Sequence, residues 1–202
     1  MSNPTHGQIT ALITEVLLPF HQIQRDNELP TTPLRPENDV EHSWSVAVLA
    51  CSLAPQIDPV LNIGKIAQFA IVHDLVELFS GDTSIFAPPE QLATKAAREH
   101  AALQRIRRDY AAFPWLADTI TEYEAKLTPE AKFVSAVDKY IALQYDYLDQ
   151  AAYLRRRGVT KSQYHQCIAK PKQKGHLNPA IGEYYDQVLA LLDAHPEYFY
   201  QA

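Results

Sequence analysis

The chain has 202 residues, of which 47% are hydrophobic, and its formal net charge at pH 7 is -6. A chain of this length and composition can bury a core as one domain. The negative charge gives no global field that would favour nucleic acid or an anionic membrane. The N-terminal stretch lacks a basic region and carries Glu15 among its apolar residues, unlike a secretory signal, and no run reaches the ~18 apolar residues of a membrane span. We therefore expect a cytoplasmic protein that binds neither membrane nor nucleic acid.

Apolar residues recur at helical spacing along most of the chain, which predicts an all-α fold. A first helix is expected over about residues 7–23. A loop over residues 27–37 follows it, because the three prolines there cannot lie in a helix interior. Asn38, with Glu41 three residues later, resembles a capping box and predicts a second helix to about Leu53, before Pro55.

The later helices have similar start signals. Asn62 is expected to cap a third helix that runs to about Ser80, before Gly81. The Thr128-Pro129-Glu130 sequence combines a capping hydroxyl, a proline in the first turn and an acid at the positive helix end. The remaining helices are expected over about residues 90–112, 115–126 and 128–157, from Thr160, and from Asn178 to about residue 194. We expect one domain over residues 1–202, with a core at about 10–150 and C-terminal helices at about 160–195.

The third expected helix contains the stretch "IVHDLVELFSGD", which places His73, Asp74 and Glu77 within one turn. This helix is apolar around almost its whole circumference, which indicates a position in the middle of a helical bundle. A buried carboxylate without a partner costs several kcal/mol, so these acids need a cation or strong donors. A divalent metal bound to His73 and Asp74 would supply that charge.

A lone buried His–Asp pair is more often two groups that satisfy each other, but other segments favour a metal. Asp138 lies among apolar residues at helical spacing and is expected to face the core. His42 lies in the first turn of another apolar helix. The mixed nitrogen and oxygen set of His42, His73, Asp74 and Asp138 suits one divalent transition metal, Mn, Fe, Co, Ni or Zn, better than calcium or magnesium. Glu77 and Asp82 are the candidates for proton transfer or substrate positioning beside it.

These residues resemble the H…HD…D pattern of the HD-domain metal-dependent phosphohydrolases. The stretches "RPENDVEHS" (35–43) and "HDLVELFSGD" (73–82) are similar to the 5'-deoxynucleotidase branch, and the resemblance covers about residues 10–150. It implies an HD-domain helical bundle with the metal site between core helices, and an enzyme that removes the 5'-phosphate of deoxyribonucleoside monophosphates. It also implies a homodimer. The implied metal ligands are His42, His73, Asp74 and Asp138, the implied active-site acids are Glu77 and Asp82, and the implied substrate-binding arginines are Arg35 and, by a looser match, Arg25.

The sequence therefore predicts a metal-dependent phosphomonoesterase that hydrolyses nucleoside 5'-monophosphates, with deoxyribonucleotides favoured, by means of metal-activated water. One alternative is an HD phosphohydrolase of another phosphoester: a cyclic nucleotide, a dinucleotide or a phosphosugar. Another is a metal-bound nucleotide sensor without catalysis, although a purely structural metal would not need Glu77 and Asp82 nearby. Lys95 and Arg98 could also face the cleft, but we expect them to lie on a solvated helix face, and we expect the basic run 155–157 to lie at a helix end.

Overall fold

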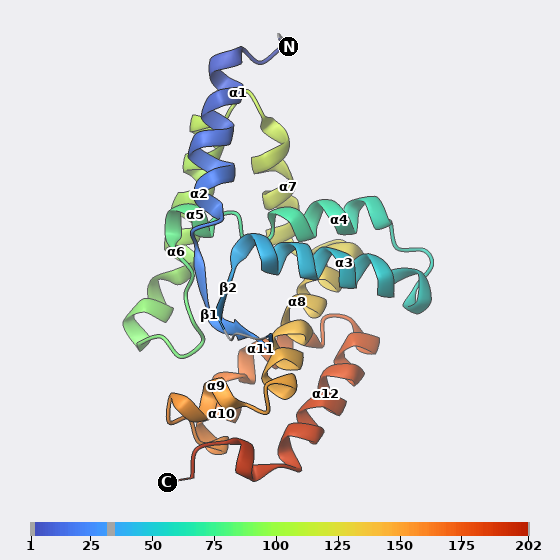
Figure 1. Cartoon of the computed structure of the whole chain (residues 1–202). Helices are drawn as coiled ribbons and strands as arrows, with labels where there is room; N and C mark the ends of the chain where they lie inside the picture. The colour runs from blue at the N-terminus through green and yellow to red at the C-terminus, as the bar shows by residue number, and fades with distance from the viewer. Residues whose placement is uncertain (1–2, 32–34, 202) are drawn as a thin grey trace.

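The computed structural model describes residues 3–31 and 35–201, so Pro33, in the middle of the predicted loop, lies outside the described residues. The fold is a helical bundle with one small hairpin (Figure 1). The prediction of a mostly helical bundle is confirmed. The helices are α1 (His6–Leu12), α2 (Leu18–Phe20), α3 (Asp39–Ile57), α4 (Ile63–Val72), α5 (Glu77–Ser80), α6 (Pro89–Asp109), α7 (Pro114–Ala125), α8 (Pro129–Leu148), α9 (Ala152–Arg156), α10 (Lys161–Cys167), α11 (Ala169–Gly175) and α12 (Pro179–Asp193). A π-helical turn, Ile13–Leu17, joins α1 to α2, and a 3-10 turn, Pro196–Tyr198, follows α12. No helix in the described ranges is both long and apolar enough to cross a membrane.

The helix starts follow the predicted capping residues. The Asn38 side chain accepts hydrogen bonds from the backbone N–H groups of Val40 and Glu41, and the Glu41 carboxylate accepts one from the Asn38 N–H. This capping box satisfies donors that the first turn of α3 would otherwise leave without partners. The side chains of Asn62, Thr128, Thr160 and Asn178 also accept a backbone hydrogen bond at the starts of α4, α8, α10 and α12, and Thr160 forms a full capping box with Gln163.

A two-stranded antiparallel hairpin occupies much of the predicted loop, so the all-α prediction missed it. Strand β1 (Gln24–Leu29) pairs with β2 (Arg35–Asn38), with Gln24 opposite Asn38 and Glu28 opposite Pro36. Three residues of β1, 25–27, therefore oppose Glu37 alone. Such a bulge bends a strand and redirects its side chains, and this one turns Arg25 towards the end of α4.

The third predicted helix is interrupted. Helix α4 ends at Val72, and the chain continues in tight turns, in which Leu75 N–H donates to the Val72 carbonyl (3.0 Å) and Glu77 N–H donates to the Asp74 carbonyl (2.8 Å). Side chains three residues apart eclipse each other in this 3-10 geometry, so Asp74 and Glu77 lie on one side. The prediction of an unbroken helix to Ser80 was wrong. Helix α3, by contrast, extends beyond Leu53 to Ile57 and includes Pro55 in its last turn. Proline has no N–H group, so the helix lacks the hydrogen bond that this position would donate to the Cys51 carbonyl.

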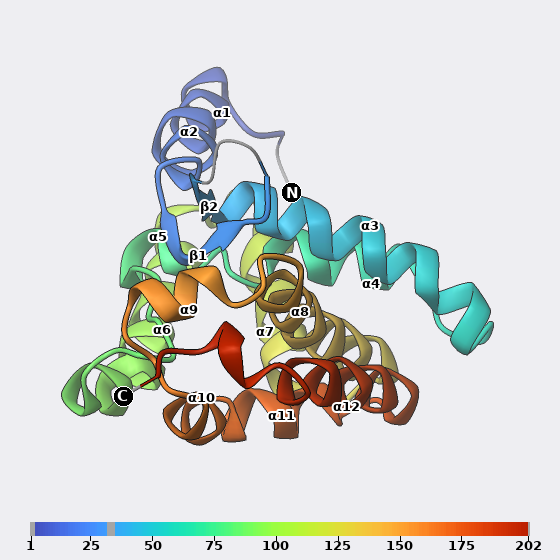
Figure 2. The same ribbon diagram turned by 60° about the horizontal axis from the view of Figure 1, so that its bottom comes forward.

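Helix α8 is the central element of the bundle. It packs against α3 and α4 on one side and against α11 and α12 on the other (Figures 1 and 2). One buried apolar cluster joins α3, α4 and α8 and includes Val46, Phe69 and Val134. A second joins the lower part of α8 to the C-terminal helices and includes Tyr164 and Leu192. Because α8 belongs to both clusters, it connects the two halves of the bundle.

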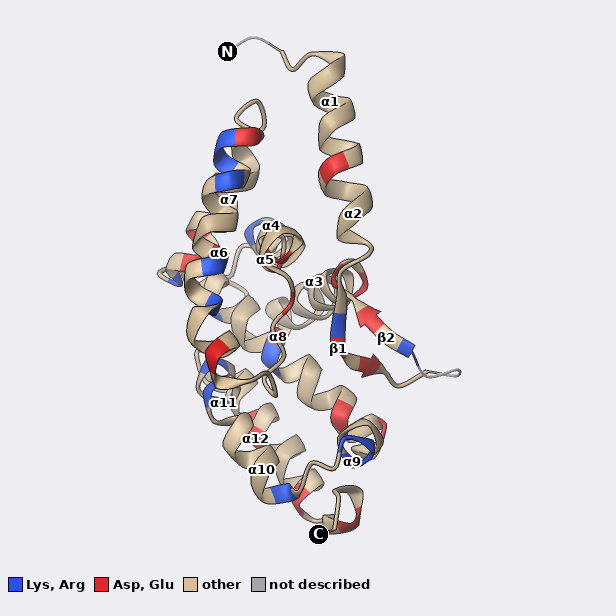
Figure 3. Ribbon diagram, turned by 90° about the vertical axis from the view of Figure 1, so that its left-hand side faces the viewer, with Lys and Arg blue, Asp and Glu red and all other residues tan. Residues whose placement is uncertain are grey.

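Helix α8 ends at Leu148, and not at residue 157 as predicted. Gln150 and Ala151 have φ values of 57° and 50°, in the left-handed region, and they turn the chain into α9. Arg156 and Arg157 at the end of α9 then reach β1, where they pair with Glu28 and Asp26. The basic run 155–157 therefore contributes contacts within the fold. Figure 3 shows basic and acidic residues interspersed over the helices in view.

Candidate functional site

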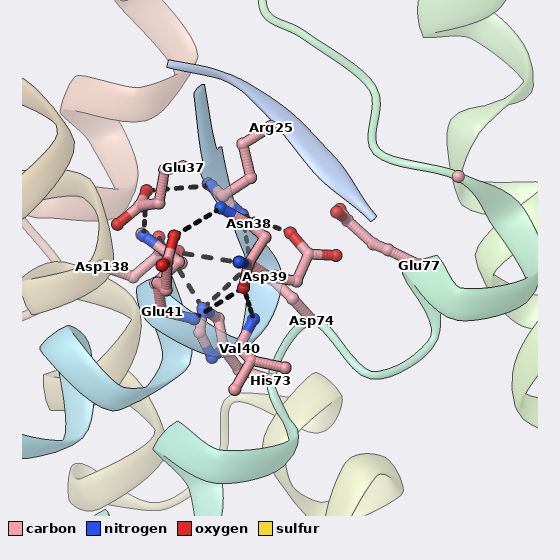
Figure 4. A network of polar contacts seen from close by, with 12 residues as sticks. Arg25, Glu37, Asn38, Asp39, Val40, Glu41, His73, Asp74, Glu77 and Asp138 are labelled. Atoms are coloured by element: carbon pink, nitrogen blue, oxygen red, sulfur yellow. Dashed lines mark hydrogen bonds and ion pairs between the residues drawn. The ribbon is translucent and has the colours of Figure 1, made fainter. Parts of the chain in front are cut away.

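Four of the predicted site residues meet where α3, the end of α4 and α8 approach one another (Figure 4). His42 Nε2 lies 3.1 Å from Asp138 Oδ1 and 3.9 Å from Asp74 Oδ2. His73 Nε2 lies 3.1 Å from Asp74 Oδ2 and 4.0 Å from Asp138 Oδ1. The side chains of His42, His73 and Asp138 are almost entirely buried. Two imidazoles and two carboxylates thus converge from three parts of the chain, and we call these four residues the His/Asp group.

The outer nitrogen of each imidazole already has an acceptor. His73 Nδ1 lies 2.9 Å from the Ala70 carbonyl, so it carries the proton and donates it. His42 Nδ1 lies 3.1 Å from Glu37 Oε2, which favours the same tautomer. The Nε2 atoms then direct lone pairs at the carboxylates of Asp74 and Asp138. Among the described residues, His73 Nε2 has no hydrogen-bond partner.

The imidazole lone pairs and the carboxylate oxygens that face them repel each other unless a cation lies between them. Imidazole nitrogens held by an outer carbonyl or carboxylate are the usual arrangement around a bound metal. The mixture of imidazole and carboxylate ligands suits a divalent transition ion. The His/Asp group could therefore bind a divalent metal.

Arg25 lies beside this group and contacts three acids. Its guanidinium lies 2.6 Å from Asp74 Oδ2 and 3.3 Å from Asp39 Oδ1, and its Nε lies 3.4 Å from Glu37 Oε2 (Figure 4). Glu37 and Asp39 are completely buried, and the sequence prediction missed both as site residues. Burial alone would raise the pKa of Asp74, but the positive charge of Arg25, 2.6 Å away, opposes this effect, and the pKa lies well below its ordinary value. Arg25 therefore balances part of the buried negative charge.

Arg35 has a different environment from Arg25. Its side chain is 49% exposed, and its guanidinium pairs with both oxygens of Glu41 at 2.6 and 2.8 Å. The structure thus does not bring Arg35 into the His/Asp group. Because Glu41 also completes the capping box of α3, Arg35 supports the start of that helix.

Glu77 and Asp82 lie at one cleft but differ in burial. The Glu77 side chain is buried, and its Oε1 lies 3.4 Å from Lys95 Nζ. Burial, together with the nearby charge of Asp74, holds the pKa of Glu77 well above its ordinary value. Asp82 is half-buried and lines the same cleft.

Lys95 and Arg98 do not project into solvent, so the prediction of a solvated helix face was wrong for both. Lys95 lies in the cleft, where it pairs with Glu77. Arg98 donates to the Ser80 carbonyl and to Thr83 Oγ1, and thereby holds the loop that carries Asp82. Both basic residues lie on a helix of low hydrophobicity, so no apolar pattern marked them as inward-facing.

The cleft contains about 800 Å³ of open space, including the part that is open to solvent. Arg25, Asp74 and Glu77 lie at one end. The cleft continues along α8 to Asp146 and the C-terminal helices, which the sequence did not connect with the site.

Comparisons with known proteins agree with this geometry. Residues 20–178 match the family model described as the HD domain. The chain belongs to the HD-domain family. The crystal structure of a predicted metal-dependent phosphohydrolase from Magnetospirillum magnetotacticum is similar over 96% of both chains, with a TM-score of 0.77 and 26% identity.

Two curated relatives of this HD-domain chain are named 5'-deoxynucleotidase. The protein from Xenopus laevis is 32% identical over 152 residues, which cover 68% of this chain and 67% of the relative. The protein from Schizosaccharomyces pombe is 26% identical over 162 residues, which cover 74% of this chain and 77% of the relative. The family resemblance and the prediction of an HD-family enzyme of the metal-dependent phosphohydrolase class are confirmed.

Proposed function

We propose that this HD-domain protein is a phosphomonoesterase that hydrolyses nucleoside 5'-monophosphates and prefers deoxyribonucleotides. The observation that carries the proposal is the His/Asp group, with the basic side chains of Arg25 and Lys95 at the same end of the cleft. The names of the relatives from Xenopus laevis and Schizosaccharomyces pombe support this substrate class.

In this proposal His42, His73, Asp74 and Asp138 hold one divalent transition metal. When bound, such an ion supplies Lewis-acid activation of water and neutralises charge on the phosphoryl oxygens. Glu37 and the Ala70 carbonyl orient the two imidazoles through their Nδ1 atoms. Arg25 and Lys95 provide positive charge for the phosphate. Burial alone would lower the pKa of Lys95, but the carboxylates around it raise that pKa, so Lys95 keeps its charge.

Glu77 is the proposed proton-transfer group. Burial and Asp74 raise its pKa, which favours the protonated form more than in an ordinary glutamate, so Glu77 can donate a proton to the 5'-oxygen as the P–O5' bond breaks. The water oxygen forms the new bond to phosphorus, and a proton of that water returns to the Glu77 carboxylate. The products are the nucleoside and inorganic phosphate. Asp82, at the rim, can accept a hydrogen bond from a sugar hydroxyl and so orient the substrate.

The direct test is phosphate release from matched deoxyribo- and ribonucleoside 5'-monophosphates. Metal-stripped protein is resupplied separately with Mn, Co, Zn and Mg, with Asp74→Ala as the blank. Metal-dependent release that favours the deoxy series and disappears in the variant is the expected result. If protein shown to bind a metal releases no phosphate from any nucleotide, the proposed substrate class is wrong.

Glu77→Gln is expected to lower kcat by about 100-fold, since the amide cannot carry the transferred proton and general acid–base catalysis contributes at least this much. Glu99→Gln is a matched control, because Glu99 Oε1 also lies 3.4 Å from Lys95 Nζ. Glu99 lies one helical turn after Lys95 on α6, whereas Glu77 lies on α5. Steady-state phosphate release measures both. Equal losses of kcat in the two variants would contradict the role of Glu77 and point to Lys95 instead.

A further inference from the structure

The cleft extends well beyond the His/Asp group, along a face of α8. Lys139, Ala142, Leu143 and Asp146 line it at positions i, i+3, i+4 and i+7, which form one stripe of an α-helix. Lys139 lies at the end of the cleft next to the His/Asp group, because its Nζ lies 2.7 Å from Asp138 Oδ2. Seven residues of α-helix span roughly 10 Å, so Asp146 lies about that far along α8 from Lys139.

The part of the cleft towards the C-terminal helices has apolar side chains around the carboxyl group of Asp146. Leu143 and Phe86 line it from one side, and Ile168 and Tyr185 line it from the C-terminal helices. Asp146 is the acid there, and its Oδ2 accepts a hydrogen bond of 2.6 Å from the Tyr164 hydroxyl. In the part of the chain that the structure describes, this is the one hydrogen bond of the Asp146 side chain, and no basic residue pairs with it.

Tyr164 fixes the position of this carboxyl group. The tyrosine is 1% exposed, and its ring packs against Phe199 with ring centroids 5.4 Å apart. Burial raises the pKa of Asp146 to about 7, so both its ionised and its protonated forms are present near neutral pH. In either form, an oxygen of the carboxyl group can accept a hydrogen bond from a ligand N–H. The protonated form can also donate to a neighbouring ring nitrogen.

A nucleoside 5'-monophosphate has its phosphate at one end and its base at the other. With the phosphate beside the His/Asp group, the base would lie towards Asp146, between apolar side chains that suit its faces. We propose that Asp146, held by Tyr164, recognises the nucleobase and favours bases with an exocyclic amino group, adenine, cytosine or guanine, over thymine and uracil. This inference rests on the proposed function for the orientation of the ligand. Thymine and uracil present a carbonyl oxygen where cytosine presents the amino group. That oxygen would face an acceptor in the ionised form of Asp146, so the preference belongs to this form.

The test compares substrates that differ only at this edge. The pairs are the 5'-monophosphates of deoxycytidine and deoxyuridine, and those of deoxyadenosine and deoxyinosine. Wild type is expected to show the higher kcat/KM for the amino-bearing member of each pair. In Asp146→Asn an amide N–H group replaces one acceptor, so the ratio of kcat/KM between the two members should fall by about tenfold or more.

The change should appear mainly in KM, because Asp146 does not touch the phosphate. Tyr164→Phe, which removes the positioning hydrogen bond and keeps the packed ring, should lower the same ratio by less, again through KM. If both variants keep the wild-type ratio, or lose activity on both members of a pair equally, Asp146 is structural and the inference is overturned.

The binding of deoxycytidine and deoxyuridine, measured by calorimetry, separates this inference from the proposed function. If wild type releases no phosphate but binds deoxycytidine more tightly, and Asp146→Asn loses that preference, the base site stands and the hydrolytic proposal fails. If wild type binds neither nucleoside, or binds both equally, the base site is overturned whatever the result for hydrolysis.

Discussion

Asp138→Asn is expected to abolish tight metal binding and to lower phosphate release by more than the roughly 100-fold that loss of an outer metal contact can cost. Asp138 Oδ1 lies within 4.0 Å of Nε2 in both His42 and His73, so this one carboxylate faces both imidazoles. The amide removes a negative charge and one oxygen donor but keeps the shape of the side chain. Metal content of the purified protein and steady-state phosphate release are the measurements.

Thermal unfolding with and without added metal distinguishes loss of the ion from loss of the fold. A metal that binds only the folded chain stabilises it by about 2.7 kcal/mol at a concentration 100-fold above Kd. Wild type and the exposed-site control Asp118→Asn should show this stabilisation, whereas Asp138→Asn should remain folded and lose it. Full metal content and unchanged turnover in Asp138→Asn would remove Asp138 from the proposed ligand set.

Arg25→Ala is expected to destabilise the metal-free protein by about 3–5 kcal/mol, because removal of one partner leaves buried charges uncompensated. Arg25 lies within 3.4 Å of Glu37, Asp39 and Asp74, and two of these acids are fully buried. Burial and the neighbouring Asp74 raise the pKa of Asp39 to about 7, even with Arg25 present. Urea unfolding near neutral pH measures the change in the free energy of unfolding.

The control for Arg25 is the other predicted arginine. Arg35→Ala should cost no more than about 1 kcal/mol, because the Arg35–Glu41 pair is exposed to water. It should also leave phosphate release near the wild-type rate. If Arg35→Ala destabilises the protein as much as Arg25→Ala, the charge balance ascribed to Arg25 is wrong. If Arg35→Ala alone abolishes release, Arg35 and not Arg25 contacts the substrate.

Local chemistry explains which parts of the fold the sequence could predict. The cap of α3 depends on residues three positions apart, Asn38 and Glu41, so the printed sequence contains all the necessary information. The inward orientation of Asp138 follows from the apolar residues at helical spacing around it. The members of the His/Asp group could be predicted from the sequence for the same reason, since each lies on an apolar helix or at its end.

Long-range contacts explain what the sequence could not predict. Glu37 and Asp39 pair with Arg25, which lies in the bulge of β1, and nothing in their local sequence indicates these contacts. The end of α8 was missed because its left-handed residues are Gln150 and Ala151, and glycine is the usual signal for that conformation. Lys95 faces the cleft because of its contact with Glu77, which comes from a separate helix.

The break after α8 has a consequence for the boundaries of the catalytic unit. The short helix α9 contains none of the proposed metal ligands, yet Arg156 and Arg157 at its end pair with β1. Their partners are Glu28, which follows the bulge, and Asp26, which lies inside the bulge next to Arg25. A continuous helix through residue 157 would carry these arginines straight on along the axis of α8, away from the turn that brings them to β1. Residues 152–157 thus hold the hairpin in place through these ion pairs. A fragment that stopped at Leu148 would keep every proposed ligand and lose the anchor of the arginine that neutralises them.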